Sequence, residues 1–456
     1  MEKTAIIHGI VAAGDRMEKA ILILGGGKIQ AILAPDADPS RLYPGCRIID
    51  AAGQYVLPGG VDGHVHFGNT DEIPIADDFF TGSLAALAGG TTTVVDFCEP
   101  PPGADPLACI EERKVFAKDS AVDYALHYSF TENYRQELPR IPEILEAGIS
   151  AFKVYTVYPN MTLQPGDLYC IMEAVAGRGT LLVHAEENSL IECMKERYRT
   201  GKEDMTTLAL TRPNLSEQMA VETAAAAAKL AGAKICIAHV SCKETVEILA
   251  RERRAGNRDF ILESCPHYMQ FTSEKLAGPE GALYTMNPPL RSRADADRLM
   301  DAVLGEEISI LSTDHCPFLK SHKLGKTYDT VPCGVDGVQI RLPYYFSEAV
   351  LKRGLSMDAF VRLTSTNAAK FYGLYPRKGS IAVGSDADLV FFDPEGSWTY
   401  GADTQAGAAD YSIYEGLRLR GRCTRTIKGG RTVMENGIVS AQKGGGRFLR
   451  TAMPKA

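Results

Sequence analysis

Several histidines of this chain stand where short apolar segments end. His64 and His66 form a His-Val-His triplet. Because residues i and i+2 of a strand point to the same side, we expect both imidazoles to face one site. His184 and His239 each close a later apolar segment, and Asp314 follows another. Four imidazoles and a carboxylate suit a borderline divalent cation such as Zn²⁺. The set predicts a metal site, whereas any single member has an equally good interpretation as a buried polar residue beneath a loop.

Lys153 lies inside the apolar segment 151–155. Burying an unpaired ammonium group is costly in free energy. One interpretation is a lysine that forms a salt bridge at the rim of the site. The other is an amine whose pKa is depressed by burial and which reacts with CO₂ to give a carbamate. A carbamate is an anion with two oxygens, so it is able to bridge two cations.

The segments that carry these residues belong to a longer alternation of strand-like and helical patterns. Eight apolar runs alternate with helix candidates such as 216–231 and 356–372. This order is typical of repeated βαβ units. The predicted fold class is α/β, a (β/α)₈ TIM barrel over residues 56–378, with its site at the C-terminal ends of the strands. The runs are 61–67, 92–97, 123–129, 150–155, 180–185, 234–240, 259–264 and 308–313.

Short strand-like segments occupy both ends of the chain. Residues 1–55 hold runs separated by Gly, Pro and Asp, and residues 379–443 hold further runs broken by turns such as Asn436-Gly437. An Asn-Gly pair between apolar runs is a strong hairpin signal. We expect the two regions to pair into one small β-sandwich domain. We expect residues 444–456 to form a tail that is flexible unless a neighbouring subunit holds it.

Composition narrows the class of protein. The chain has 456 residues, and its 49 Lys and Arg against 57 Asp and Glu give a net charge of −8. This mild acidity argues against a nucleic-acid partner, which requires a basic surface. No apolar run is long enough to span a membrane, and no signal peptide is recognisable at the start. The 11 cysteines are scattered singly, which favours a reducing, cytoplasmic location.

The motifs together resemble the cyclic amidohydrolases of the amidohydrolase superfamily, in particular the dihydropyrimidinase/hydantoinase branch. The resemblance covers nearly the whole chain. It rests on Pro-Gly-Gly-Val-Asp-Gly-His-Val-His-Phe at 58–67, Gly-Gly-Thr-Thr-Thr at 89–93, Phe-Lys at 152–153, Val-His-Ala-Glu at 183–186, Ala-His-Val-Ser at 238–241, Asn-Pro-Pro-Leu-Arg at 287–291, Ser-Thr-Asp-His-Cys at 312–316 and Gly-Ser-Asp-Ala-Asp-Leu at 384–389.

The resemblance implies a site for two metal ions, usually zinc. It assigns His64, His66 and Asp314 to one ion, His184 and His239 to the other, and a carboxylated Lys153 (N6-carboxylysine) to both. A bridging hydroxide would attack the ring carbonyl, and Asp314 would carry its proton to the leaving ring nitrogen. Tyr158 matches the family tyrosine that hydrogen-bonds the developing oxyanion.

The resemblance also implies how the ring is recognised. Main-chain groups near two positions serve in this branch, and they correspond to Asn287 and Asp336, the second standing where Asn is common. If only backbone atoms are used, the change to Asp336 matters little; if the side chain contributes, it alters substrate choice. Phe67 suits an apolar substituent on the ring, with a place in the cavity wall as the plainer interpretation. The expected reaction opens 5-substituted hydantoins or 5,6-dihydropyrimidines to N-carbamoyl amino acids.

Three alternatives share these ligands or this fold. Allantoinases and other cyclic ureide hydrolases use the same metal site. Dihydroorotases do too, but their motif places an Arg two positions after the second His, where this chain has Gly68. Some relatives have lost metal ligands and serve as non-catalytic scaffolds, which the intact ligand positions argue against. Relatives are commonly homo-oligomers, so we expect a tetramer or dimer.

Overall fold

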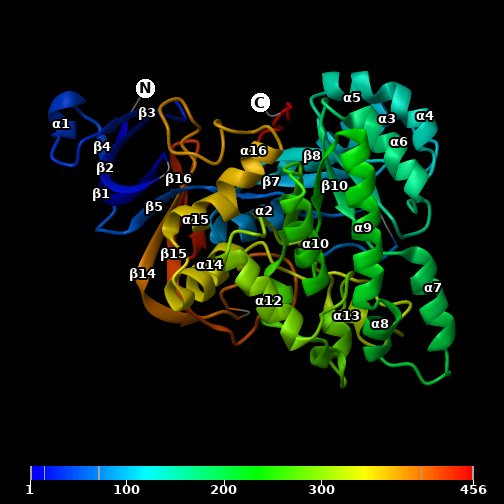
Figure 1. Ribbon diagram of the computed structural model, residues 1–456. Helices are drawn as coiled ribbons and strands as arrows, with labels where there is room; N and C mark the ends of the chain where they lie inside the picture. The colour runs from blue at the N-terminus through cyan, green and yellow to red at the C-terminus, as the bar shows by residue number, and fades with distance from the viewer. Residues whose placement is uncertain (1–2, 15, 70–71, 402, 454–456) are drawn as a thin grey trace.

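The barrel strands follow one another around a single parallel sheet. The computed structural model describes residues 3–14, 16–69, 72–401 and 403–453. Over this part of the chain, eight strands pair in sequence order, each parallel to the next (Figure 1). They are β6 (Gly60–Asp62), β7 (Thr91–Cys98), β8 (Asp123–Ser129), β9 (Ala151–Tyr155), β10 (Thr180–His184), β11 (Lys234–Ile237), β12 (Phe260–Ser264) and β13 (Ile310–Leu311). Each lies within or overlaps a run expected from the sequence.

The first and last strands meet just beyond their ends. Val65 and His315 form an isolated parallel bridge, and the backbone N–H of His66 donates to the carbonyl of His315 at 2.8 Å. These contacts bring β6 and β13 together on the same side as the histidines. The (β/α)₈ architecture is therefore confirmed, and its circle closes at the C-terminal ends of the strands.

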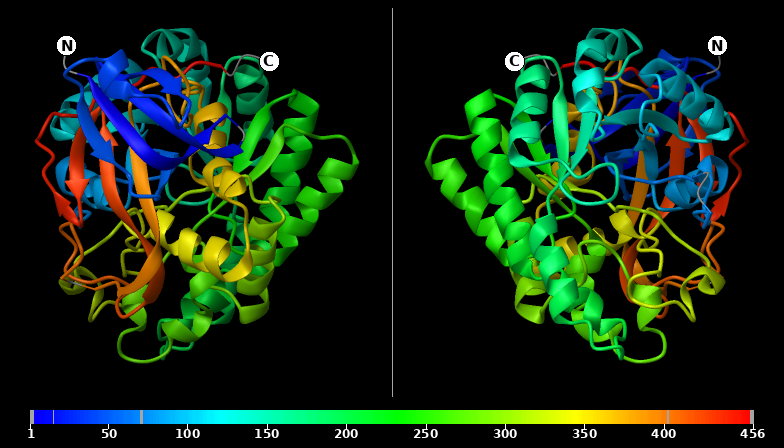
Figure 2. Two further views of the ribbon diagram at one scale, coloured as in Figure 1. Left: turned by 90° about the vertical axis from the view of Figure 1, so that its left-hand side faces the viewer. Right: turned by 90° about the vertical axis from the view of Figure 1, so that its right-hand side faces the viewer.

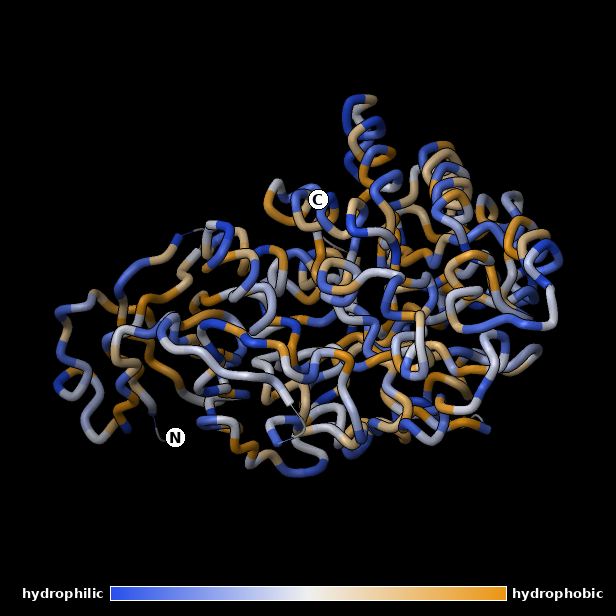
Figure 3. Tube along the Cα trace, turned by 90° about the horizontal axis from the view of Figure 1, so that it is seen from below, coloured by the Kyte–Doolittle hydropathy of each residue, from blue (hydrophilic) through white to orange (hydrophobic). Residues whose placement is uncertain are grey.

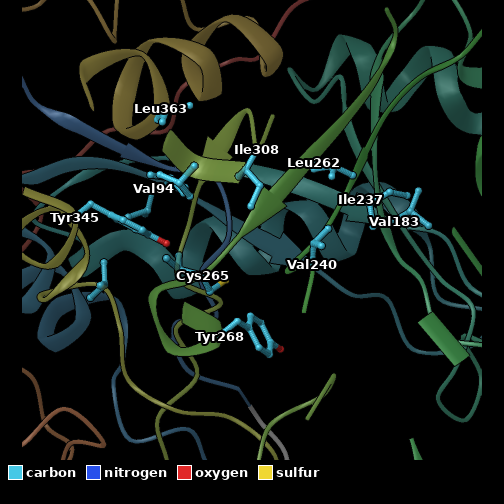
Figure 4. Packing of buried hydrophobic residues seen from close by; sticks show 14 of the residues in the cluster. Val94, Val183, Ile237, Val240, Leu262, Cys265, Tyr268, Ile308, Tyr345 and Leu363 are labelled. Atoms are coloured by element: carbon cyan, nitrogen blue, oxygen red, sulfur yellow. The ribbon is translucent and has the colours of Figure 1, made fainter. Parts of the chain in front are cut away.

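Alternation along the strands divides the core into two layers. Leu182 of β10 faces the barrel interior, whereas Leu181 and Val183 face the surrounding helices. Figure 4 shows part of the outer layer, in which Val183, Ile237 and Leu262 come from neighbouring strands. Lys153 pairs in register with Leu182, so it shares the inward face.

The helices cover the outside of the barrel, with apolar and polar residues interleaved along them (Figure 3). Helix α9 (Asn214–Ala231) has an alanine-rich centre with high helix propensity, and Gly232, with a φ of 68°, provides its left-handed C-cap. The helix expected over 356–372 forms as α15, a π-helical turn over Arg362–Thr366, and α16. None of the helices in the described ranges is long and apolar enough to cross a membrane.

The helix bounds are α1 (Pro39–Leu42), α2 (Phe79–Ala88), α3 (Pro106–Phe116), α4 (Tyr134–Glu137), α5 (Ile141–Glu146), α6 (Pro165–Val175), α7 (Asn188–Arg197), α8 (Thr206–Thr211), α9 (Asn214–Ala231), α10 (Lys243–Arg254), α11 (Pro266–Gln270), α12 (Arg293–Leu304), α13 (Lys320–Lys323), α14 (Arg341–Tyr345), α15 (Met357–Val361) and α16 (Asn367–Phe371).

Both ends of the chain build one further sheet. Strand β14 (Leu389–Thr399) pairs antiparallel with β5 (Tyr55–Pro58), which joins the C-terminal strands to the N-terminal ones (Figure 2). Residues from both regions, such as Leu22 and Phe391, share one buried cluster. The composite β domain forms as a continuous mixed sheet. Its strands are β1 (Thr4–Ala13), β2 (Arg16–Gly25), β3 (Lys28–Leu33), β4 (Arg47–Asp50), β5 (Tyr55–Pro58), β14 (Leu389–Thr399), β15 (Arg418–Lys428), β16 (Arg431–Glu435) and β17 (Ile438–Val439).

The segment after the β domain packs against the N-terminal ends of the barrel strands of its own chain. The backbone N–H of Leu449 donates to Tyr124 at 2.7 Å, and that of Thr451 donates to Gly148 at 2.9 Å. Leu449 is fully buried. The tail, which we expected to be flexible unless a neighbouring subunit holds it, thus packs on its own chain as far as residue 451. Residues 454–456 lie outside the described residues.

Buried charges hold the barrel, the β domain and this segment together. Asp123 at the start of β8 accepts from Lys378 at 2.6 Å and from Lys428 at 2.8 Å. Asp386 accepts from Lys28 at 2.6 Å and from Lys378 at 2.9 Å. Together with Asp388, these aspartates form a tight cluster of carboxylates, which lysine side chains neutralise.

Candidate active site

The barrel strands deliver the expected ligand residues to one cavity. His64 and His66 follow β6, Lys153 lies in β9, and His184 ends β10. His239 and Asp314 follow β11 and β13. All six line a cavity of about 770 Å³ at the C-terminal ends of the strands. The structure thus brings together the whole ligand set expected from the sequence.

Asp314 forms the centre of the first group of ligands. One of its oxygens, Oδ1, lies 3.1 Å from His64 Nε2 and 3.2 Å from His66 Nε2. Burial opposes ionisation of Asp314, but the two histidines hold the pKa of its carboxyl well below the usual range. Asp314 is therefore a carboxylate, which is the form that binds a cation.

His184 and His239 form the second group. Their ring centroids are 4.5 Å apart, and the His239 ring lies 5.3 Å from that of His64. Potential ligand atoms of His64, His239 and Asp314 all lie within 4.8 Å of one another. Burial lowers the pKa of both His184 and His239, which favours the neutral imidazole that metals require.

Lys153 stands between the two groups as a buried amine. Its side chain has no exposed surface, and its Nζ has no hydrogen-bond partner among the described residues. Burial lowers the pKa of Lys153 to about 8. A substantial fraction of the amine is therefore neutral and nucleophilic near neutral pH. An unpaired nitrogen in this position fits the interpretation as a carbamate better than that as a salt bridge.

Three of the site residues have left-handed backbone conformations, which are uncommon outside glycine. The φ angles are 87° at Tyr158, 36° at His239 and 50° at Asp314. Such a conformation costs on the order of 1–3 kcal/mol per residue and persists where the surrounding structure enforces it. Here each residue lies just beyond a barrel strand, where the chain turns sharply and directs the side chain over the cavity.

Tyr158 and Asn287 lie next to each other in the lining of the cavity. The Tyr158 ring lies 5.1 Å from that of His184. Burial raises the pKa of Tyr158, although a hydrogen bond with the Asn287 side chain acts in the opposite direction. The hydroxyl therefore stays protonated and can donate a hydrogen bond. The Asn287 oxygen is buried and has no partner among the described residues, so it is free to accept from a ligand.

Two predicted substrate-binding side chains point elsewhere. Phe67 is fully buried and packs edge-to-face on Phe79, 5.7 Å away, because alternation after His66 turns it towards α2. The structure does not bring Phe67 to the cavity. The Asp336 carboxylate accepts from the Ser412 hydroxyl at 2.6 Å. It holds a loop of the C-terminal region, and Asp336 is not among the residues that line the cavity.

Buried carboxylates behind the histidines were not foreseen from the sequence. Glu263 Oε1 lies 2.8 Å from His64 Nδ1, and Glu186 Oε2 lies 2.8 Å from His184 Nε2. Arg212 in turn pairs with Glu186. The available signal was an acidic residue inside the apolar run 259–264, and another two positions after His184.

Lys323 stabilises the part of the cavity wall that includes Asn287. It is fully buried, and its Nζ donates to the carbonyls of Thr285 at 3.1 Å and Gly334 at 2.7 Å. The backbone N–H of Gly334 also donates to Thr285 at 2.9 Å. The lysine therefore ties together the two backbone segments that border the cavity beside Asn287. Sequence reasoning assigned it no role.

A parallel barrel with histidines, a lysine and an aspartate gathered over the C-terminal ends of its strands defines a metal-dependent hydrolase architecture. A model of the Amidohydrolase family matches residues 55–433, and the chain belongs to this family. The D-hydantoinase of Geobacillus stearothermophilus is 35% identical, covering 98% of this chain and 96% of the relative. A D-phenylhydantoinase of Escherichia coli is 33% identical over 98% of both chains.

Solved structures are similar over the whole length. The dihydropyrimidinase of Brevibacillus agri NCHU1002 superposes with a TM-score of 0.95 at 31% identity and covers 100% of both chains. This likeness includes the composite β domain as well as the barrel. The expected resemblance to the dihydropyrimidinase/hydantoinase branch is therefore confirmed.

Proposed function

We propose that the protein is a hydrolase that opens 5-substituted hydantoins or 5,6-dihydropyrimidines to N-carbamoyl amino acids. The observation that carries this proposal is the meeting of all six ligand residues around one cavity. The names of the relatives, which are D-hydantoinases and a dihydropyrimidinase, support the same class of substrate.

The donor set fits two divalent metal ions. His64 and His66 with Asp314 would hold one, His184 and His239 the other. Asp314 and Glu263 favour positive charge at His64, and they raise the pKa of that imidazole although burial and Lys153 oppose them. The unpaired Lys153 amine would bind both ions as a carbamate. When bound, the ions would lower the pKa of a shared water and polarise the ring carbonyl.

The side chains that line the cavity would then have separate roles in ring opening. Water adds to the ring carbonyl, the carbonyl carbon–nitrogen bond breaks, and the proton from the water ends on the leaving nitrogen. Asp314 is placed to accept that proton and deliver it, as general base and then acid. The Tyr158 hydroxyl donates to the carbonyl oxygen as its negative charge grows. Asn287 and backbone groups near Gly334 would orient the ring.

An apolar substituent on the ring has a matching wall. The lining of the cavity includes large apolar side chains, which could contact an aryl or alkyl group. This wall takes the role expected of Phe67. Its members are Ile75, Phe116, Met161, Leu208, Phe318 and Val331.

Several finer features belong to the same proposal. We propose zinc as the metal, N6-carboxylysine at Lys153, and CO₂ as the source of the carboxyl group. We further propose a homotetramer or dimer and a cytoplasmic location. The scattered thiols and the family resemblance support these features.

The test is ring opening of dihydrouracil and 5-phenylhydantoin, side by side, by protein loaded with Zn²⁺ in bicarbonate. Turnover of either substrate is the expected result, and the ratio of kcat/KM identifies the preferred substituent. Two bound metals without turnover would overturn this substrate class in favour of allantoin or another ureide. Neither metal nor turnover would instead point to a non-catalytic scaffold.

A further inference from the structure

The two groups of ligands differ in what lies behind their histidines. His64 Nδ1 is bonded to Glu263, which leaves Nε2 facing Asp314 and the cavity. His184 Nε2 is bonded to Glu186, which leaves Nδ1 for a metal. Both carboxylates are fully buried. Each histidine is thus fixed in one orientation and one tautomer by a carboxylate that cannot itself reach the cavity.

The charge on Glu186 is already matched. The same oxygen that binds His184 also accepts from Arg212 Nη1 at 2.5 Å. Arg212 is itself buried and has this single carboxylate as its ion-pair partner among the described residues. The Glu186–Arg212 pair is therefore close to neutral as seen from His184.

The charge on Glu263 is not matched in this way. Its second oxygen accepts from the Ser312 hydroxyl at 2.8 Å, which is a neutral donor. Within the described ranges, no lysine or arginine forms an ion pair with Glu263. Lys153 and Arg341 interact with Glu263 only through longer-range electrostatics, and Arg341 forms its ion pair with Asp62, at 3.7 Å. Glu263 therefore lacks a direct ion-pair partner of the kind that Arg212 provides for Glu186.

His239 adds to the contrast between the two groups. Its Nδ1 is buried and has no hydrogen-bond partner among the residues described. The second group therefore has one histidine supported by a neutralised carboxylate and one without support. The first group has Asp314 as a ligand and Glu263 behind it.

We propose that Glu263 is a positioning residue that makes the His64, His66 and Asp314 position the tighter of two metal sites. The His184 and His239 position, backed by the neutralised Glu186, is the more readily emptied. This inference rests on the proposed function, because it requires that the six ligands hold two ions. Carboxylates behind ligating histidines change metal affinity by about 10–100-fold, and an anionic partner raises the basicity of the imidazole.

The test measures metal release rather than activity. Protein loaded with Co²⁺ is mixed with excess chelator, and the loss of visible absorbance is followed in time. The wild-type chain should lose its metals in two phases, one fast and one slow, each corresponding to one equivalent of Co²⁺ per chain. Glu263→Gln keeps the shape and the acceptor oxygen but removes the charge, and it should accelerate the slow phase ~10–100-fold. Glu186→Gln should accelerate the fast phase by a smaller factor than Glu263→Gln accelerates the slow phase. Glu274→Gln, at an exposed position, should change neither phase.

Arg212→Gln should change the rate of metal release in the opposite direction to the Glu263→Gln and Glu186→Gln variants. Removing the guanidinium restores the charge of Glu186, so the fast phase should slow, which a general loosening of the fold could not produce. A single release phase, or an effect of Glu263→Gln confined to the fast phase, would overturn the inference. Failure of wild-type protein to bind two metals would instead overturn the proposed function.

Discussion

His64 Nε2 and Asp314 Oδ1 lie 3.1 Å apart although one residue follows the first barrel strand and the other follows the last. The contact stands beside the bridge between Val65 and His315, which joins β6 to β13. The first group of ligands is therefore completed by closure of the barrel. Neither strand alone carries a full ligand set.

Lys153→Ala should remove the ligand shared by both groups. We expect loss of bound metal and a fall in ring-opening rate of at least ~10²-fold. Short carboxylic acids such as propionate should restore part of both, because they supply two oxygens where the carbamate would be. Metal analysis and rates with and without propionate are the measurements. Lys326→Ala, at an exposed position, is the control. Full metal content in Lys153→Ala would contradict the bridge.

Asp314→Asn should reduce turnover more than binding. The amide cannot accept the proton from water, so we expect kcat to fall ~10³-fold with a smaller change in KM. Steady-state kinetics at fixed metal content is the measurement. The control is Asp297→Asn, at an exposed position of α12. An unchanged kcat would remove Asp314 as the carrier of the proton.

Tyr158→Phe should remove a donor to the developing oxyanion. Because the buried hydroxyl remains protonated, its loss should lower kcat by ~10²–10³-fold, as for other oxyanion donors. Tyr169→Phe, on the outer helix α6 where the hydroxyl bonds Glu173, serves as the comparison. Near-normal turnover of Tyr158→Phe would assign the oxyanion to another donor.

Lys323→Met should weaken the wall beside Asn287. The substitution keeps the length of the side chain but removes the donor to the Gly334 carbonyl, at a cost of about 1–3 kcal/mol for a buried group, whereas the Thr285 carbonyl keeps the N–H of Gly334. We expect a lower Tm and a higher KM with two metals still bound. Lys326→Met should change neither. A normal KM with a lowered Tm would limit Lys323 to a structural role.

Asp386 should make the free energy of unfolding depend on pH in the acidic range. Burial opposes its ionisation, but Lys378, Lys28 and Arg377 lower its pKa to about 2, from an ordinary value of 3.8. A depressed pKa stabilises the fold above the ordinary value, and this contribution disappears as pH falls from about 4 to about 2. Asp386→Asn should therefore cost ~2 kcal/mol at neutral pH and less in acid. Denaturant unfolding at several pH values measures the difference. A constant difference at every pH would contradict this linkage.

The barrel and its ligands were predictable because both follow from local patterns. Apolar runs of strand length predicted the positions of the strands. Because His184, His239 and Asp314 each stand at the end of such a run, the pattern also predicted that they lie at the same end of the barrel. The same alternation that directed His64 and His66 inward already directed Phe67 outward, so its burial against Phe79 could have been foreseen.

What the sequence could not supply were contacts between distant segments. Nothing local shows that Asp336 bonds Ser412, or that Glu263 lies behind His64. Such pairs depend on the register of one strand against another and on the paths of long loops. The neutralisation of Glu186 by Arg212 is of the same kind, since the two residues lie 26 positions apart on the long connection between β10 and β11.

The meeting of β6 and β13 has a consequence for biosynthesis. A ribosome releases His64 and His66 early, but Asp314 emerges only after seven further barrel strands have been made. A growing chain therefore exposes histidines long before it can assemble their carboxylate partner. A chain that stops short of Asp314 therefore lacks the carboxylate that completes the first group of ligands.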